Sequence, residues 1–190
     1  MNKPEILETN TIAETDWLKF NQITYKDYKN QVHKWDSVER KRCNGAVAII
    51  ATFKNSNKLI LIKQYRPPTN KYVIEFPAGL IDEGYSVEET AIKELIEETG
   101  YTGVIEKVYP ASYSSPGLTG ESVFMAIVSV DEDAEINQNV KQQLEGTEDI
   151  ETIIVPLKDL SATLADFEKQ GNVLDAKLAN FAISQTFLLD

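Results

Sequence analysis

Cysteine and histidine are almost absent from this 190-residue chain, which has one of each, Cys43 and His33. A single cysteine excludes an internal disulfide and a cysteine-based zinc site. A single histidine argues against a histidine metal cluster and a Ser-His-Asp triad. No apolar run approaches the roughly 20 residues that a membrane-spanning helix needs, and the N-terminal segment MNKPEILETNTIAETDW lacks the apolar stretch of a signal peptide. We therefore expect a cytoplasmic protein with no membrane partner.

Basic residues are also scarce, with 19 Lys and Arg against 30 Asp and Glu, so the formal net charge is −11. This balance argues against nucleic acid as a partner. A phosphate ester would approach such a chain poorly unless divalent cations inverted the local charge. The length and the 42% content of hydrophobic residues indicate one domain with a sizeable core, with room for a small extension.

The most informative segment is a predicted helix over residues 87–99, which carries Glu94, Glu97 and Glu98. Their spacing of three and four residues places the three carboxylates on one helical face, where like charges repel. A solvated acidic face is one interpretation. The other follows from the Pro-Ala-Gly turn at residues 77–79, whose backbone carbonyls can join the carboxylates in an all-oxygen site for a hard divalent cation.

Hydrophobic patterning predicts a mixture of strands and helices in the rest of the chain. Residues 45–53 form a continuous apolar run, typical of a core strand, and residues 58–65 return as the second strand of a hairpin. Further strands are expected at 16–27, 33–41, 72–76, 104–111, 123–130 and 152–156, a polar loop at 131–147, and amphipathic helices at 157–169 and 173–188. The expected fold class is an α/β sandwich.

Residues 79–101, GLIDEGYSVEETAIKELIEETGY, resemble the signature of the Nudix hydrolases. The positions that match are Gly79, Glu94, Leu95, Glu97, Glu98, Gly100 and Tyr101. Two positions depart from the pattern, because Tyr85 replaces its first glutamate and Lys93 replaces its arginine. Lysine cannot reproduce the bidentate fork of arginine, so the number of bound metal ions stays open. The resemblance implies the Nudix fold, a mixed sheet between helices, over residues 43–190, preceded by an N-terminal β-strand extension over residues 1–42.

Three further segments resemble the ADP-ribose and ADP-sugar pyrophosphatase branch of this family: Arg66-Pro67-Pro68, EFPAGLI at residues 75–81, and SSPGL at residues 114–118. This resemblance implies hydrolysis of the diphosphate bond of ADP-ribose, or of a related nucleoside diphosphate sugar, to AMP and a sugar phosphate. It implies Mg²⁺ or Mn²⁺ as cofactor. The implied metal ligands are Ala78, Glu94, Glu98 and Glu148. The group that orients the attacking water is then Glu148 or Glu97.

The same resemblance implies a substrate site shared within a homodimer. Trp17 and Trp35 would sandwich the adenine, one from each subunit, because residues 1–42 exchange across the dimer. Stacking of an aromatic ring on a base is worth about 1–3 kcal/mol. Arg40 and Arg66 would contact the diphosphate and the adjacent ribose, and the substrate site would be completed by Leu80 and Ser115. The alternatives without a functional role are that the tryptophans belong to the core, that the arginines are ordinary surface residues, and that Glu148 is a solvated charge on a loop.

Two other functions compete with this prediction. The first is a Nudix enzyme for another nucleotide, such as GDP-mannose, a dinucleoside polyphosphate or an oxidised nucleotide. The second is a non-catalytic Nudix domain that senses ADP-ribose, which Tyr85 at the first signature glutamate favours and the three retained helical glutamates oppose.

Overall fold

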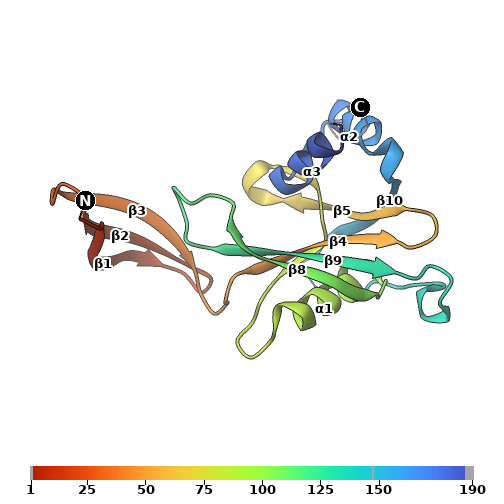
Figure 1. The fold of residues 1–190 in the computed structure, drawn as a ribbon, viewed down its shortest axis with the longest axis horizontal. Coiled ribbons are helices and arrows are strands. Elements are labelled where there is room, and N and C mark those ends of the chain that lie inside the picture. The colour runs from red at the N-terminus through yellow and green to blue at the C-terminus, as the bar shows by residue number, and fades with distance from the viewer. Residues whose placement is uncertain (1, 147, 187–190) are drawn as a thin grey trace.

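The computed structural model describes residues 2–146 and 148–186. Two β-sheets and three α-helices make up this part of the chain (Figure 1). The elements in chain order are β1 (Glu5–Glu14), β2 (Leu18–Lys26), β3 (Val32–Arg40), β4 (Ala46–Phe53), β5 (Lys58–Arg66), β6 (Lys71–Glu75), β7 (Ala78–Leu80), α1 (Val87–Thr99), β8 (Val104–Tyr113), β9 (Ser122–Val130), β10 (Ile150–Pro156), α2 (Leu160–Lys169), β11 (Val173–Leu174) and α3 (Ala176–Thr186), with short 3₁₀ turns at Pro67–Thr69, Glu135–Asn137 and Leu157–Asp159.

The larger sheet has eight strands and is mixed. Its main path runs β11-β6-β5-β4-β9-β8, while β10 pairs with β5 and β7 pairs with β4. β4 is parallel to β9 and antiparallel to β5, which confirms the predicted β4–β5 hairpin. The continuous apolar sequence of β4 is explained by this central position, since both of its faces are covered.

Each face of this sheet carries its own hydrophobic core. On one face, Val47 and Ile60 pack with Ala91 and Leu95 of α1. On the other face the core consists of strand residues and residues of α2 and α3, including Leu59, Leu61, Leu160, Leu164 and Leu178. Figure 1 shows α1 below the sheet and the other two helices above it. The expected mixed sheet between helices is therefore confirmed.

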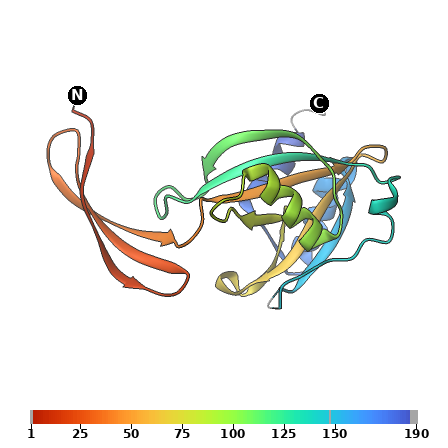
Figure 2. The same ribbon diagram turned by 90° about the horizontal axis from the view of Figure 1, so that it is seen from below.

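The three N-terminal strands form a separate antiparallel sheet that lacks a hydrophobic core. Every residue of β1 is exposed, and the only residue of the sheet that is buried, Asn21, is polar. Figures 1 and 2 show this sheet beside the larger one, with the β8–β9 loop reaching toward it. Val38 makes one of the contacts between them, because its N–H donates to the carbonyl of Leu118 at 2.9 Å.

Some boundaries differ from the predicted ones. β1 and β7 were not expected, because the first has a polar sequence and the second is only three residues long. The predicted helix at 157–169 starts with a 3₁₀ turn, and α2 begins at Leu160. The predicted helix at 173–188 begins instead as strand β11. α3 starts after Asp175, whose carboxylate accepts the N–H of Lys177 at 2.8 Å, and residues 187–188 lie outside the described residues.

Within the described ranges, no helix combines the length and the apolar character that a membrane crossing demands.

Candidate active site

Local signals at both ends of α1 fix its position along the chain. Ser86 and Glu89 form a capping box, in which Ser86 Oγ accepts the N–H of Glu89 at 3.1 Å and Glu89 Oε2 accepts the N–H of Ser86 at 2.9 Å. The helix ends at Gly100, which has a left-handed φ of 79°. A Cβ there would also collide with the backbone of Lys141. These constraints determine which residues of α1 face the sheet.

Glu98 is the most deeply placed of the three helical glutamates, and it contacts β7. It is 3% exposed, and its Oε2 accepts the backbone N–H of Ala78 at 2.9 Å. The carbonyl of Pro77 and the N–H of Ile81 bond toward the β4 side at 2.8 and 3.0 Å. Because such bonds alternate along an antiparallel ladder, the backbone groups of Ala78 and Leu80 point away from β4. The Ala78 carbonyl is therefore directed away from β4, as a backbone ligand requires.

Glu94 lies directly against Gly79. A Cβ built on Gly79 would overlap the carboxyl group of Glu94, so only glycine leaves space for this side chain. The close approach explains why a glycine of β7 and a glutamate of α1 occur fifteen positions apart in one motif.

Burial of Glu94 and Glu98 strongly affects their ionisation. Burial raises the pKa of Glu98 to about 8, assisted by the negative charges of Glu94 and Glu148 and opposed by the Ala78 N–H. Burial likewise raises the pKa of Glu94 to about 7, and the ammonium of Lys93 opposes this rise. The two carboxylates are thus short of positive partners.

The ammonium of Lys93 pairs more closely with Glu97 than with Glu94. Its ammonium lies 2.8 Å from Glu97 Oε2 and 3.8 Å from Glu94 Oε1. The contacts are single-point contacts, as expected for lysine at the position of the family's arginine. Tyr85, which replaces the first signature glutamate, is 53% exposed. Glu97 therefore has the closest compensating charge, Glu94 shares that charge at a longer distance, and Glu98 forms no ion pair with any described residue.

Glu148 lies on the loop before β10. Its Oε2 accepts the N–H of Glu145 at 2.8 Å, and its own N–H donates to the Glu145 carbonyl at 3.0 Å. Its negative charge acts on both Glu94 and Glu98, since it raises the pKa of each carboxyl. Glu148 is therefore near Glu94 and Glu98, while its carboxylate accepts a hydrogen bond within its own turn.

Arg66 stands at the end of β5 beside Glu75 of β6. Its Nε donates to Glu75 Oε1 at 2.8 Å, and Glu75 is 8% exposed. Burial raises the pKa of Glu75, and the Arg66 charge opposes that rise. Arg66 and Glu148 line the same pocket of about 660 Å³. The terminal amino groups of Arg66 make no hydrogen bond to any residue in the described ranges, so they are available to a bound anion.

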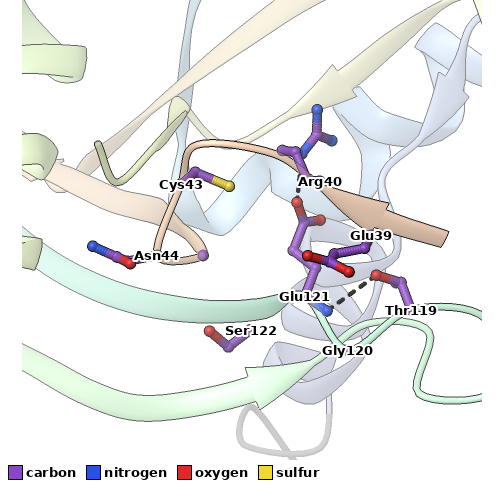
Figure 3. A pocket seen from close by; sticks show the side chains of 9 residues that line it. Glu39, Arg40, Cys43, Asn44, Thr119, Gly120, Glu121 and Ser122 are labelled. Carbon is purple, nitrogen blue, oxygen red and sulfur yellow. Dashed lines mark hydrogen bonds and ion pairs between the residues drawn. The ribbon is translucent and has the colours of Figure 1, made fainter. Parts of the chain in front are cut away.

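Arg40 lies elsewhere, where the N-terminal sheet meets the larger one. Its Nε donates to Glu121 Oε1 at 2.6 Å. Both residues line a pocket of about 290 Å³, and Figure 3 shows Cys43 and Asn44 across the pocket from them. Ser115 belongs to the neighbouring β8–β9 loop, where its carbonyl closes a turn by accepting the N–H of Leu118 at 2.9 Å.

The two tryptophans are exposed and lie apart on the N-terminal sheet, Trp17 just before β2 and Trp35 within β3. Trp17 is 71% exposed, and Trp35 is 49% exposed with its Nε1 donating to the Gly117 carbonyl at 3.0 Å. Trp35 pairs with Ile23, six residues beyond Trp17. Six strand residues span about 20 Å, so the two rings of one chain cannot clasp one base. Because both rings are exposed, the alternative that the tryptophans belong to the core is wrong.

The residues around α1 fit a divalent cation. Within residues 2–146 and 148–186, no three acidic, histidine or cysteine side chains meet closely enough to form a complete cage. The buried carboxylate of Glu98 and the half-buried carboxylate of Glu94, which together have too little positive charge nearby, nevertheless lie beside a backbone carbonyl directed away from β4. This donor set consists of oxygen alone, which suits Mg²⁺ or Mn²⁺ better than softer metals.

The Nudix domain family model matches residues 44–176, which include α1 and the β7 turn. The chain belongs to the Nudix family. The prediction of a Nudix hydrolase from the signature at residues 79–101 is therefore confirmed. Nudix hydrolases in general use divalent metal ions, in agreement with the oxygen-rich donor set on α1.

The sequences of individual relatives align with this chain over most of their own length. The chain is 36% identical to the ADP-ribose pyrophosphatase of Saccharomyces cerevisiae, over 95% of this chain and 84% of that protein. It is 34% identical to the ADP-sugar pyrophosphatase of Mus musculus, over 91% and 83%. A solved structure described as an ADP compounds hydrolase superposes with a TM-score of 0.71 over 97% of this chain and 94% of that one, at 20% identity, which shows a shared fold.

Sequence reasoning gave no role to two residues that support the site. The first is Glu75, the buried partner of Arg66, for which the available signal was an acidic residue in the apolar strand sequence KYVIEF. The second is Gln142, whose side-chain amide donates to the carbonyl of Glu98 at 2.6 Å. Nothing in the polar segment around Gln142 distinguishes it, because its role depends on contacts 44 residues away.

Proposed function

We propose that this Nudix enzyme hydrolyses the diphosphate bond of ADP-ribose, or of a closely related nucleoside diphosphate sugar, to AMP and a sugar phosphate. The observation that carries the proposal is the position of two carboxylates, the half-buried Glu94 and the buried Glu98, against the backbone of Ala78 and Gly79. The names of the yeast and mouse relatives support the ADP-sugar substrate class.

We assign Glu94, Glu98, Glu148 and the Ala78 carbonyl as ligands of Mg²⁺ or Mn²⁺, which would neutralise the diphosphate oxygens when bound. Glu148 orients the attacking water. The water oxygen forms a bond to one phosphorus and releases a proton to solvent, while the bond from that phosphorus to the bridging oxygen breaks and this oxygen leaves with the other phosphate group. Glu148 must release the Glu145 N–H before it can hold water, and Glu97, paired with Lys93, is the alternative group for this role.

Arg66 is suited to the diphosphate because it shares a pocket with Glu148 and its terminal amino groups have no hydrogen-bond partner among the residues that the structure describes. We also assign Leu80 to the substrate site, because its backbone groups point away from β4 in the same way as those of Ala78. Arg40 and Ser115 lie near the N-terminal sheet, so within one chain they belong with the tryptophans rather than with α1.

We further propose a homodimer in which the strands of residues 1–42 exchange and each adenine lies between Trp17 of one subunit and Trp35 of the other. The N-terminal sheet supports this because it has no apolar core while exposing large apolar side chains, namely Ile6, Leu7, Ile12, Trp17, Leu18, Phe20, Val32 and Trp35. A three-stranded sheet needs a packed face for stability, which a second subunit supplies. The cytoplasmic location stays a prediction from the sequence.

The substrate assignment is tested with a panel assayed at fixed Mg²⁺. ADP-ribose, GDP-mannose and a dinucleoside polyphosphate are incubated with the protein, and the products are separated by anion-exchange chromatography. We expect AMP and a sugar phosphate from ADP-ribose, and no AMP in excess EDTA. Faster cleavage of GDP-mannose would reassign the substrate. Binding of ADP-ribose without any product would favour the sensing alternative.

A further inference from the structure

The loop that carries Glu148 is tied to the body of the protein on its N-terminal side by Gln142. Its Nε2 donates to the carbonyl of Glu98 at 2.6 Å and to that of Ile150 at 3.0 Å. The start of the loop is thereby joined both to the end of α1 and to the start of β10. Between Gln142 and β10, Glu148 makes its hydrogen bonds only with Glu145, among the described residues.

Asp149, the residue immediately after Glu148, is held from β6. The hydroxyl of Tyr72 donates to Asp149 Oδ2 at 2.9 Å. The strand order is β6-β5-β10, and Tyr72 pairs with Tyr65 of β5. The Tyr72 side chain therefore reaches across a whole strand to contact the residue that precedes β10.

The ring of Tyr72 is itself fixed by two neighbours on β5. It packs edge-to-face on Tyr65, with centroids 5.7 Å apart, and the ammonium of Lys63 lies 5.1 Å from its centroid. Lys63 also pairs with Glu151 of β10 at 3.0 Å. The hydroxyl of Tyr72 thus extends from a supported ring, which suits it to set the position of a loop.

We propose that Tyr72 is a positioning residue for Glu148, acting through its hydrogen bond to Asp149. This rests on the proposed function, in which Glu148 orients the attacking water. Because the neighbouring residue Asp149 is held by Tyr72, the backbone beside Glu148 stays in place. The Glu148 side chain then rotates from the Glu145 N–H to a water. Without the Tyr72 hydroxyl, the hydrogen bond that joins Asp149 to β6 is lost, and the Glu148 carboxylate samples more positions.

The test compares Tyr72→Phe with Tyr65→Phe. Both changes remove one hydroxyl from the same pair of rings, but the Tyr65 hydroxyl donates to Asn70 Oδ1 at 2.7 Å and does not reach the loop. We expect Tyr72→Phe to lower kcat for ADP-ribose about 3- to 10-fold, the loss of one modest hydrogen bond, with KM within about twofold. Tyr65→Phe should keep both constants within about twofold. Equal effects of the two variants would overturn the proposal, and so would a change confined to KM, which would indicate direct substrate contact.

Amide hydrogen exchange of Glu145 and Glu148 gives a readout that does not depend on turnover. Tyr72→Phe should accelerate exchange at these amides, whereas Tyr65→Phe should leave it at the native rate. Unchanged exchange in Tyr72→Phe would show that the hydroxyl does not hold the loop. If the native protein cleaves no ADP-sugar, the proposed function fails, while accelerated exchange would still establish the anchor on its own.

Changes at Asp149 test the same contact from the other side. Asp149→Asn keeps an oxygen at the accepting position and should retain most of the native kcat, whereas Asp149→Ala should match Tyr72→Phe. The two losses should not add in the double variant Tyr72→Phe/Asp149→Ala, because both remove one interaction. Additive losses would overturn the coupling of Tyr72 to Asp149. These variants also keep the test decisive if Tyr72→Phe folds poorly.

Discussion

The carboxylate of Glu98 accepts the backbone N–H of Ala78 at 2.9 Å while almost completely buried. This one contact connects the helix that supplies the acidic side chains to the short strand that supplies a backbone carbonyl. It satisfies one oxygen of Glu98 but leaves its negative charge without a cation, and burial accordingly raises the pKa of this carboxyl to about 8. The arrangement makes metal binding, protonation and stability dependent on one another.

The metal-free protein should lose stability as the pH rises from about 4.5 to about 8. Burial raises the folded-state pKa of Glu94 to about 7 and that of Glu98 to about 8, from a usual 4.5. In this window the folded state keeps protons that the unfolded chain has released, so the free energy of unfolding falls with rising pH. Thermal melts in EDTA check this, and Glu98→Gln should flatten the dependence. An equally steep dependence in Glu98→Gln would show that Glu98 does not cause it.

Added Mg²⁺ should oppose that loss, because the cation competes with protons for the same carboxylates. We expect Mg²⁺ to raise Tm more at pH 8 than at pH 6 in the native protein and to have little effect in Glu98→Gln. The same shift in both proteins would place the bound cation elsewhere.

Replacing Gly79 by alanine should inactivate the enzyme without unfolding it. The three atoms nearest to the added Cβ all belong to the flexible side chain of Glu94, which must move away from β7. We expect kcat to fall on the order of 100-fold, since small displacements of a catalytic group have such effects. The free energy of unfolding should change by about 1 kcal/mol or less. A large loss of stability together with activity would mean that the backbone at Gly79, rather than Glu94, gave way.

Glu148→Gln should lower kcat by roughly 100-fold with little change in KM, because a group that orients water acts mainly in the transition state. Steady-state kinetics on ADP-ribose check the split, and Glu97→Gln serves as the comparison. If Glu97→Gln shows the larger loss of kcat, the water-orienting role belongs to Glu97.

Mixing Trp17→Ala with Trp35→Ala should restore activity if each adenine site takes one tryptophan from each subunit. A heterodimer then has one site lacking both rings and one intact site. After random reassembly about a quarter of all sites are intact, because about half of the dimers are mixed. Measurements at ADP-ribose below KM should detect this recovery. No recovery, or a fully active monomer in light scattering, would contradict the shared site.

The parts of the structure that local sequence signals determine were predicted well. α1 spans Val87–Thr99 as expected, because Ser86, Glu89 and Gly100 mark its ends within the sequence itself. The spacing of Glu94, Glu97 and Glu98 likewise predicts their common face. The spacing alone could not show that Lys93 lies closer to Glu97 than to Glu94, or that Glu98 is the buried member of the three.

Contacts between distant parts of the chain could not be predicted from the sequence. The pairing of Arg40 with Glu121 joins residues 81 positions apart, and the contact of Tyr72 with Asp149 joins residues 77 positions apart. β1 was missed for a related reason, since a polar strand without a buried face has no hydrophobic alternation. Such pairings depend on the register and order of the strands, which leave no local pattern in the sequence.

The central claim, that Glu98 holds the metal for diphosphate hydrolysis, is tested most directly by the rate of AMP formation from ADP-ribose in Glu98→Gln. Glu88→Gln is the matched control, because Glu88 is an exposed glutamate of the same helix. With saturating Mg²⁺, we predict that Glu98→Gln loses roughly 100-fold or more in kcat while Glu88→Gln keeps the native rate. A Glu98→Gln enzyme that forms AMP at the native rate and still requires Mg²⁺ would contradict the account.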